Sequence, residues 1–284
     1  MKVTFWGCRG SIPTPGPDTL RHGGNTTCLE LRDAAGKLLI VDAGSGIRLL
    51  GKTLLHDKTP APIRFFLTHS HWDHLMGFPF FEPAYHKRFS FLFCGGSHAQ
   101  DSIKRYLGQQ MQAPFFPVDF SLLKAGFAFR CERPHGEEPP CRFDSLEVYP
   151  IPLSHPNGGY GFKFVEAGRS FVFLTDNELG LKHPGGLKPA LYEEFCRGAD
   201  LLVHDSQYTE KQYGFTRGWG HSTFNAAVDL AAAAGVKRLG LFHHDPDRSD
   251  DDLDRQTELC KERLLKLGSS TECFATAERM TLDL

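Results

Sequence analysis

The stretch THSHWDH, residues 68–74, places three histidines and one aspartate within six positions. Imidazole and carboxylate groups are common protein ligands of Zn²⁺ and related divalent ions. The apolar run before it predicts a buried strand, so the four side chains occupy the following turn. His69 and His71, two apart in extended backbone, point the same way and can share one ion, whereas Asp73 and His74 lie past the bend. The spacing predicts two metal ions side by side, an arrangement suited to displacement at phosphorus.

Other ligand-type residues also end apolar runs that read as strands. They are His155, Asp176, His204, Asp205, His243 and His244. If these strand ends share one rim, their side chains converge in a single crevice, as a metal site requires. His243 is preferred to His244 as a ligand because it stands nearer the strand end, and a supporting role for His244 is left open.

Taken together, these motifs resemble the metallo-β-lactamase superfamily, whose mark is an H-x-H-x-D-H turn after a buried strand. The segments GGNTTCLEL, VDAGSGIR, LSH, LTD, GWGHST and LFHHDP extend the resemblance over nearly the whole chain. The resemblance implies an αββα sandwich with its site at the rim between the sheets. It also implies one metal on His69, His71 and His155, a second on Asp73, His74 and His243, and Asp176 as the bridge between them.

Three further residues have two interpretations each. Asp42 resembles a family aspartate beneath the metal histidines, where it would orient a ligand ring, but it could equally form a turn before Gly44. His221 resembles the histidine of transfer-RNA 3′-processing nucleases that contacts the scissile phosphate or protonates the leaving oxygen, and Asp205 resembles its orienting partner. The alternative is that HST, residues 221–223, only begins a helix, with Ser222 or Thr223 as its cap.

The remaining histidines are expected to be ordinary surface or loop residues; they are His22, His56, His86, His98, His135 and His183. Eight cysteines occur without a C-x-x-C pair. Cys131, His135 and Cys141 could gather a structural zinc, but their spacing matches no standard pattern, so a plain loop is favoured.

Short apolar runs alternate with helical patterns throughout the chain. Strands are predicted near 2–7, 28–33, 37–42, 63–68, 89–94, 127–131, 146–152, 160–166, 170–175, 200–204, 238–242 and 272–282. Helices are predicted near 46–56, 74–81, 99–111, 188–197, 222–234 and 250–267. A hairpin should turn at Gly168 and Arg169, and Ser249 should cap the last helix. We expect one domain over residues 1–284, a four-layer αββα sandwich of two sheets with helices outside.

The composition and charge of the chain restrict the kinds of partner that we expect it to bind. The net charge is −2 and the pI about 6.7, so there is no strong nucleic-acid-binding signal. No apolar run approaches the length of a membrane span, and the N-terminus lacks a secretory core, so we expect a cytoplasmic protein without a membrane partner. A homodimer is compatible with the sequence.

The expected cofactors are two divalent ions, with Zn²⁺ preferred and Mn²⁺ or Fe feasible. A metal-bridging hydroxide would attack the substrate, Asp73 would accept its proton, and His221 would protonate the departing alkoxide. Asp176 stands where β-lactamases of the family usually carry cysteine, and the chain does not end in the helical domain of glutathione thioesterases. With neither a projecting arm nor a basic cluster, the preferred substrate is a small phosphodiester such as a cyclic nucleotide.

Residues 98–118 should form a helix and an aromatic lid, with Trp72, Phe115 and Phe116 as pocket walls or as core. The alternative functions are a thioesterase or other ester hydrolase of this fold, and a non-hydrolytic metal sensor or di-iron redox module. The di-iron branch usually replaces the second histidine of the turn with glutamate and carries a flavodoxin partner. His71 therefore counts against it.

Overall fold

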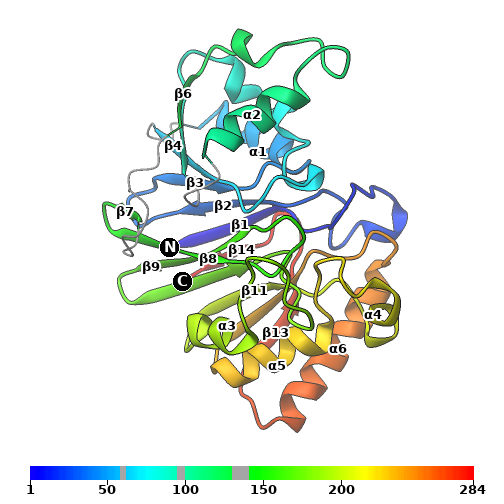
Figure 1. The fold of residues 1–284 in the computed structure, drawn as a ribbon. Coiled ribbons are helices and arrows are strands. Elements are labelled where there is room, and N and C mark those ends of the chain that lie inside the picture. The colour runs from blue at the N-terminus through cyan, green and yellow to red at the C-terminus, as the bar shows by residue number, and fades with distance from the viewer. Residues whose placement is uncertain (58–61, 95–99, 130–140) are drawn as a thin grey trace.

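Two seven-stranded sheets pack face to face, with helices on both outer sides (Figure 1). The computed structural model describes residues 1–57, 62–94, 100–129 and 141–284. The first sheet has the order β14-β1-β2-β3-β4-β5-β6, and the second has the order β13-β12-β11-β10-β9-β8-β7. The predicted αββα sandwich is confirmed.

The strands of the first sheet are β1 (Lys2–Gly7), β2 (Cys28–Arg32), β3 (Leu38–Val41), β4 (Ile63–Phe66), β5 (Ser90–Cys94), β6 (Gly126–Phe129) and β14 (Thr281–Asp283). Those of the second are β7 (Cys141–Phe143), β8 (Leu146–Pro152), β9 (Tyr160–Glu166), β10 (Arg169–Leu174), β11 (Leu201–Asp205), β12 (Arg238–Phe242) and β13 (Glu272–Ala275). Strands β3 to β6 run parallel to one another, and so do β10 to β13.

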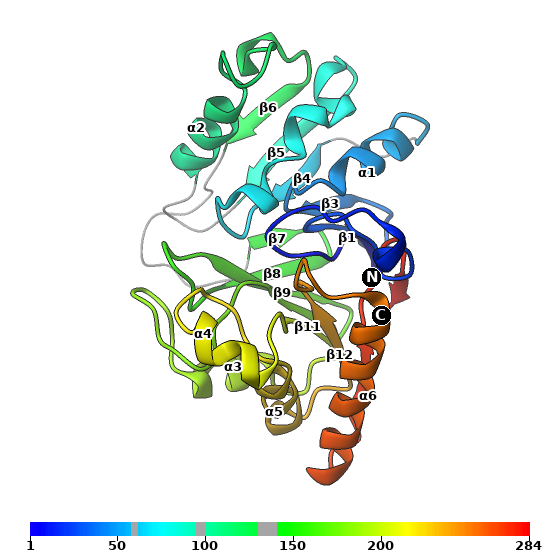
Figure 2. The same cartoon turned by 90° about the vertical axis from the view of Figure 1, so that its right-hand side faces the viewer.

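The helices are α1 (Ile47–Leu54), α2 (Gln100–Gln110), α3 (Pro189–Cys196), α4 (Glu210–Thr216), α5 (Phe224–Ala234) and α6 (Asp250–Lys266). Helices α1 and α2 cover the first sheet, while α3, α5 and α6 cover the second (Figures 1 and 2). Among the described residues, no helix combines the length and apolar content that a membrane crossing needs.

Three apolar layers explain why the central strands read as continuous hydrophobic runs. In β3, Leu39 and Val41 face the space between the sheets, whereas Leu38 and Ile40 pack with the residues of α1. Alternate residues of β10 divide in the same way between the middle layer and the helices α3 and α5. A strand buried on both faces needs apolar residues at every position, because side chains alternate across a sheet.

Several predicted elements were wrong in detail. The helix expected at 74–81 is instead two 3-10 turns, Trp72–His74 and Phe78–Phe80, because Pro79 cannot continue a helical ladder. The strand expected at 272–282 is split into β13 and β14, which belong to different sheets. The hairpin turns at Ala167 and Gly168, both with positive φ, one residue before the prediction. Strand β7 and helix α4 were missed.

Other local predictions are confirmed. Ser249 caps α6, its side chain accepting a hydrogen bond from the Asp252 backbone N–H. Thr223 rather than Ser222 caps α5. The capping box of α4 was legible in the sequence, since Thr209 and Gln212 have its T-x-x-Q spacing.

Candidate metal centre

The predicted ligand residues meet at one edge of the sandwich. The turn after β4 supplies four of them, and single residues after β8, β10 and β12 supply the others. They form two groups that share Asp176. The pocket-side cluster is His69, His71, His155 and Asp176, and the inner cluster is Asp73, His74, His243 and Asp176. Within each group the candidate ligand atoms lie within 4.8 Å of one another.

Asp176 turns one carboxylate oxygen toward each cluster. Its Oδ2 lies 3.5 Å from His69 Nε2 and 3.6 Å from His155 Nε2. Its Oδ1 lies 3.2 Å from His74 Nε2 and 3.3 Å from His243 Nε2. Burial disfavours its charge, but the neighbouring imidazoles, His243 first, hold the pKa of Asp176 well below its ordinary value. The carboxylate is therefore ionised and placed as a bridge would be.

Four of the histidines turn Nε2 toward the Asp176 carboxylate, and another group contacts the Nδ1 of each. Their Nδ1 partners are Thr68 Oγ1 at 3.1 Å for His69, Asp42 Oδ2 at 2.8 Å for His74, the Gly220 carbonyl at 2.9 Å for His155 and Gln207 Oε1 at 2.9 Å for His243. Such partners fix ring orientation and tautomer. Burial lowers the pKa of His155 to about 4, so this ring is neutral at pH 7, as a metal ligand must be.

Metal ions fit this donor set. Among the described residues, the buried Nε2 atoms of His69 and His74 have no hydrogen-bond partner. His71 Nδ1 and His155 Nε2 also face each other at only 3.0 Å. Buried polar atoms left without partners cost free energy, which a cation at the same place would recover.

Asp42 supports the inner cluster from below. Its carboxylate accepts hydrogen bonds from the His74 ring, from the Thr68 backbone N–H and from the Thr68 hydroxyl. This arrangement agrees with the orienting role implied for Asp42, although the residue also stands at a turn with φ +63°. Asp73 is held similarly, because its Oδ2 accepts from the Ser11 backbone N–H at 2.9 Å.

Three residues of the site have left-handed backbone. Asp42, Asp176 and His243 have φ values of +63°, +51° and +59°, and each follows a parallel strand. Residues other than glycine adopt this conformation at an energetic cost, and such residues cluster at functional sites. Here the left-handed residue turns the chain at the rim of the sheet.

His221 and Asp205 also come together at the site. His221 Nδ1 lies 2.9 Å from Asp205 Oδ2, and its ring stacks on that of His243 with centroids 4.8 Å apart. Burial alone would lower the pKa of His221, but the Asp205 carboxylate outweighs burial and raises it to about 9. The pair is a protonated imidazole held by a buried carboxylate at the edge of the inner cluster.

Glu178 is a supporting residue that the sequence did not single out. Its buried carboxylate accepts hydrogen bonds from His183 Nε2, the Tyr213 hydroxyl and the backbone N–H groups of Gly218 and Gly220. It thereby fixes the loop whose Gly220 carbonyl orients His155. A Cβ on Gly220 would lie 2.0 Å from His155 Nδ1, so only glycine fits there.

Gln207, which orients His243, was missed as well, and several other expectations need correction. His183 is a buried partner of Glu178 rather than an ordinary histidine. His204 binds Asn177 and its neighbour's carbonyl, and His244 binds the Thr276 carbonyl, so neither joins a cluster. Cys131, His135 and His98 lie outside the described residues, so the zinc alternative for residues 131–141 stays untested.

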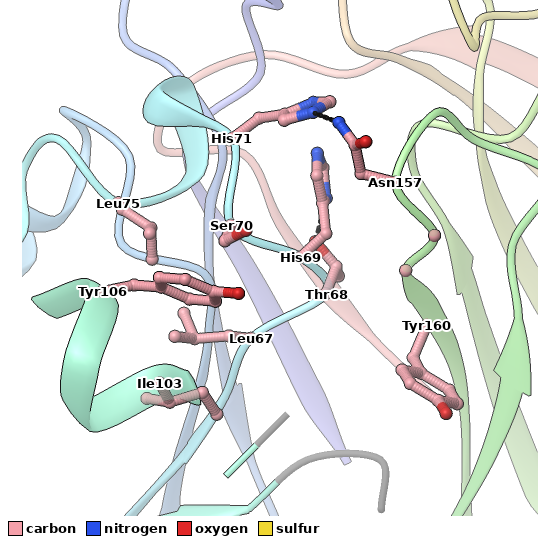
Figure 3. Close-up of a pocket in the computed structure, with 12 residues that line it drawn as sticks. Leu67, Thr68, His69, Ser70, His71, Leu75, Ile103, Tyr106, Asn157 and Tyr160 are labelled. Atoms are coloured by element: carbon pink, nitrogen blue, oxygen red, sulfur yellow. Dashed lines mark hydrogen bonds between the residues drawn. The ribbon is translucent and has the colours of Figure 1, made fainter. Parts of the chain in front are cut away.

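A pocket of about 160 Å³ opens beside the pocket-side cluster (Figure 3). His69 and His71 line the pocket and also belong to the pocket-side cluster. Helix α2 contributes Ile103 and Tyr106 to its wall, so the predicted helix beside the site is confirmed. Trp72, Phe115 and Phe116 do not line this pocket, so their prediction as its walls was wrong. Trp72 and Phe115 are 76% and 79% exposed, whereas Phe116 packs against Phe80 and the core, which was the alternative expected for it.

Known proteins with a similar sequence include ribonucleases Z. The ribonuclease Z of Porphyromonas gingivalis is 25% identical over 290 residues, covering 86% of this chain and 88% of that protein. The ribonuclease Z of Pseudomonas putida is 27% identical over 314 residues, covering 88% of each protein. These relatives agree with the branch that the sequence motifs resemble.

Solved structures show the same fold. A diphosphatase of the PhnP family superposes with a TM-score of 0.68 at 18% identity, covering 100% of this chain and 97% of that one. Human tRNase Z, short form, superposes with a TM-score of 0.62 at 20% identity, covering 100% and 99%. The family model described as the beta-lactamase superfamily domain matches residues 38–244, which carry every residue of both clusters. The chain belongs to the β-lactamase superfamily.

Proposed function

We propose that this protein is a dinuclear metal-dependent phosphodiesterase. The observation that carries the proposal is Asp176, whose two carboxylate oxygens lie 3.2–3.6 Å from the Nε2 atoms of four histidines, two in each cluster. Bound divalent ions, Zn²⁺ being preferred for this histidine-rich set, would lower the pKa of a shared water and polarise a phosphoryl oxygen.

The residues of the chain supply the proton transfers. Asp205 holds the Nδ1 proton of His221, which leaves Nε2–H to protonate the departing alkoxide. Asp73 would accept the proton of the attacking water, since its carboxylate is kept ionised and fixed by the Ser11 N–H. Paired acid and base groups of this kind suit hydrolysis and have no role in a metal sensor.

The preferred substrate is a small phosphodiester such as a cyclic nucleotide. A second candidate is the 3′ end of transfer RNA, because the similar sequences named above are ribonucleases Z. These relatives weaken the expectation that nucleic acid is not a partner. The near-neutral charge of the chain favours the small substrate, since binding a polyanion depends on phosphate contacts by lysine and arginine.

A substrate panel tests the proposal directly. Purified protein loaded with Zn²⁺ or Mn²⁺ is given bis(p-nitrophenyl) phosphate, 2′,3′- and 3′,5′-cyclic nucleotides, a precursor transfer RNA, a thioester and a β-lactam. We expect metal-dependent cleavage of a cyclic nucleotide with the highest kcat/KM. Turnover confined to the thioester or lactam would overturn the phosphodiesterase proposal, and preferred cleavage of the precursor RNA would favour the second candidate.

A further inference from the structure

The pocket beside the pocket-side cluster lies between the two halves of the sandwich. One wall comes from the turn after β4 and from α2. The other comes from the loop between β8 and β9 and from Tyr160, the first residue of β9. In Figure 3, Tyr106 extends from α2 toward the space below His69, and Tyr160 lies on the opposite side. Any group that enters this pocket lies directly against His69 and His71.

The described lining is mostly apolar, with two imidazoles, two tyrosines and a few small polar groups. Leu67, Leu75 and Ile103 supply aliphatic surface, and Tyr106 supplies an aromatic ring. Ser70 and Asn157 add a hydroxyl and an amide. The described lining residues include no aspartate, glutamate, lysine or arginine. No lysine or arginine of the described lining would hold a second phosphate or a carboxylate, although the guanidinium of Arg105, beside the lining, lies 5.1 Å from the Tyr106 ring centroid. A neutral ring could stack and form hydrogen bonds at its edge.

The size of the pocket sets a further restriction. Its volume of about 160 Å³ is well below the roughly 300–1,000 Å³ of sites that enclose a whole drug-sized ligand. It suits one planar ring system rather than a longer chain of nucleotides. The remainder of the substrate, including its phosphate, would stay at the mouth where His71 is half-buried.

Asn157 links the pocket to the cluster. Its Nδ2 lies 3.5 Å from His71 Nε2, on the far side of the ring from the Nδ1 that faces His155 (Figure 3). Its backbone is left-handed, with φ +66°, which turns the β8–β9 loop back over the pocket. The amide is therefore held where the edge of a bound ring and the pocket-side cluster meet.

We propose that this pocket is a specificity subsite for a neutral planar group, such as a nucleobase, attached to the phosphodiester that is cleaved. The inference rests on the proposed function and narrows its substrate to diesters that carry one aromatic ring within reach of the metal centre. Stacking on Tyr106 and contact with Ile103 supply most of the discrimination, and Ser70 and Asn157 read the edge of the ring.

The test compares two substrates with the same reacting five-membered ring. These are 2′,3′-cyclic AMP, which carries a base, and glycerol 1,2-cyclic phosphate, which does not. The measured quantity is the ratio of their kcat/KM values. In Tyr106→Ala we expect this ratio to fall about tenfold, through KM for the nucleotide, as loss of one stacking contact predicts. The matched control is Tyr149→Ala, a half-buried tyrosine on β8 outside the pocket, which should keep the wild-type ratio.

The outcomes separate this inference from the proposed function. An unchanged ratio in Tyr106→Ala, or an equal fall in Tyr149→Ala, would overturn the subsite even if both substrates are cleaved. Wild-type protein that cleaves neither of these diesters would overturn the subsite, and only wild-type protein that cleaves no phosphodiester of the larger substrate panel would contradict the phosphodiesterase proposal. Should Tyr106→Ala fail to fold, two other variants test the role of the ring. Tyr106→Phe keeps the ring, so the ratio of kcat/KM values should stay at the wild-type level. Tyr106→Leu removes the ring, so the ratio should fall.

Discussion

The two clusters share Asp176 but differ in their surroundings. All members of the inner cluster are buried, whereas His71 of the pocket-side cluster is half-buried and lines the pocket. Both clusters are held by neighbouring groups. Asp42, Gln207 and the Ser11 N–H each contact one member of the inner cluster. Thr68 Oγ1, the Gly220 carbonyl and the Asn157 amide each contact one member of the pocket-side cluster. From this difference in exposure we expect the inner cluster to retain its ion and the pocket-side cluster to meet substrate. Substitutions that affect one cluster more than the other test this difference.

The largest effect should follow loss of the shared residue. Asp176→Ala removes the oxygens that face both clusters, so we expect turnover of a cyclic nucleotide to fall at least about 1,000-fold, or about 4 kcal/mol of barrier. Steady-state kinetics with added Zn²⁺ or Mn²⁺ measure it. Asp229→Ala, an exposed aspartate paired with Arg263, is the control. Full activity of the Asp176 variant would refute its assignment as a bridge.

The next effect concerns the proton donor beside the inner cluster. His221→Ala should lower kcat about 100- to 1,000-fold on a substrate with an alkoxide leaving group, the range typical of a positioned acid. The loss should be much smaller on bis(p-nitrophenyl) phosphate, because p-nitrophenolate leaves without a proton. Asp205→Asn should show the same contrast in weaker form. Equal losses on both substrates would assign His221 to structure or binding.

A smaller effect should distinguish the clusters themselves. Asp42→Asn weakens the hydrogen bond that orients His74, and such changes typically cost about 10- to 100-fold in metal affinity or activity. The inner cluster should lose more metal affinity than the pocket-side cluster, because Asp42 contacts His74 directly but reaches His69 only through the Thr68 hydroxyl. Metal titration measures both affinities. Asp33→Asn is a matched control, a buried aspartate in the turn between β2 and β3. Equal weakening of both clusters would contradict their independence.

The smallest effect on turnover is expected at Glu178, which acts through the loop under the pocket-side cluster. Glu178→Gln keeps one of the two acceptor oxygens and so loses part of a set of four hydrogen bonds, each contributing about 1.5–3 kcal/mol. The free energy of unfolding should therefore fall by at least about 2 kcal/mol at pH 7. Chemical denaturation measures this change. Turnover should fall only severalfold.

The difference in free energy of unfolding between the wild type and Glu178→Gln should change with pH in one direction. Burial would raise the pKa of Glu178, but hydrogen bonds, from Tyr213 first, hold it below its ordinary value of 4.5. A carboxylate with a depressed pKa stabilises the fold above its unfolded pKa and ceases to do so as the pH falls through the folded value. The advantage of the wild type over Glu178→Gln should therefore be full at pH 7 and shrink below about pH 4.5. An advantage that grows in acid would contradict the ionised state.

The same comparison explains what the sequence could reveal. Half of each cluster lies in one six-residue turn, so the metal-binding chemistry of these residues can be recognised from a short stretch of sequence. His155, Asp176 and His243 could be placed only because each ends an apolar strand and matches a family motif. Glu178 and Gln207 gave no such signal, because a carboxylate or amide beside a loop is common and its partners come from distant segments. His204 and His244 also end strands, but their rings are used by backbone carbonyls.

The fold was predictable to a similar degree. The spacing of apolar residues and the local composition located the strands of both sheets, because each central strand is apolar on both faces. Which distant strands pair with each other could not be predicted from the local sequence. Strand β14 joins the first sheet beside β1, although it follows β13 of the second sheet by only a few residues. Short edge elements such as β7 bury too little apolar surface to leave a clear pattern.

The central claim is that two ions share Asp176, and metal content tests it most directly. Chelator-treated protein is saturated with Zn²⁺, freed of excess ion, and its bound zinc counted by mass spectrometry. We predict two ions per chain in the wild type, one in His71→Ala, which leaves the inner cluster whole, and fewer than two in Asp176→Ala. A wild type that binds one ion or none, or an Asp176→Ala variant that still binds two, would contradict the account.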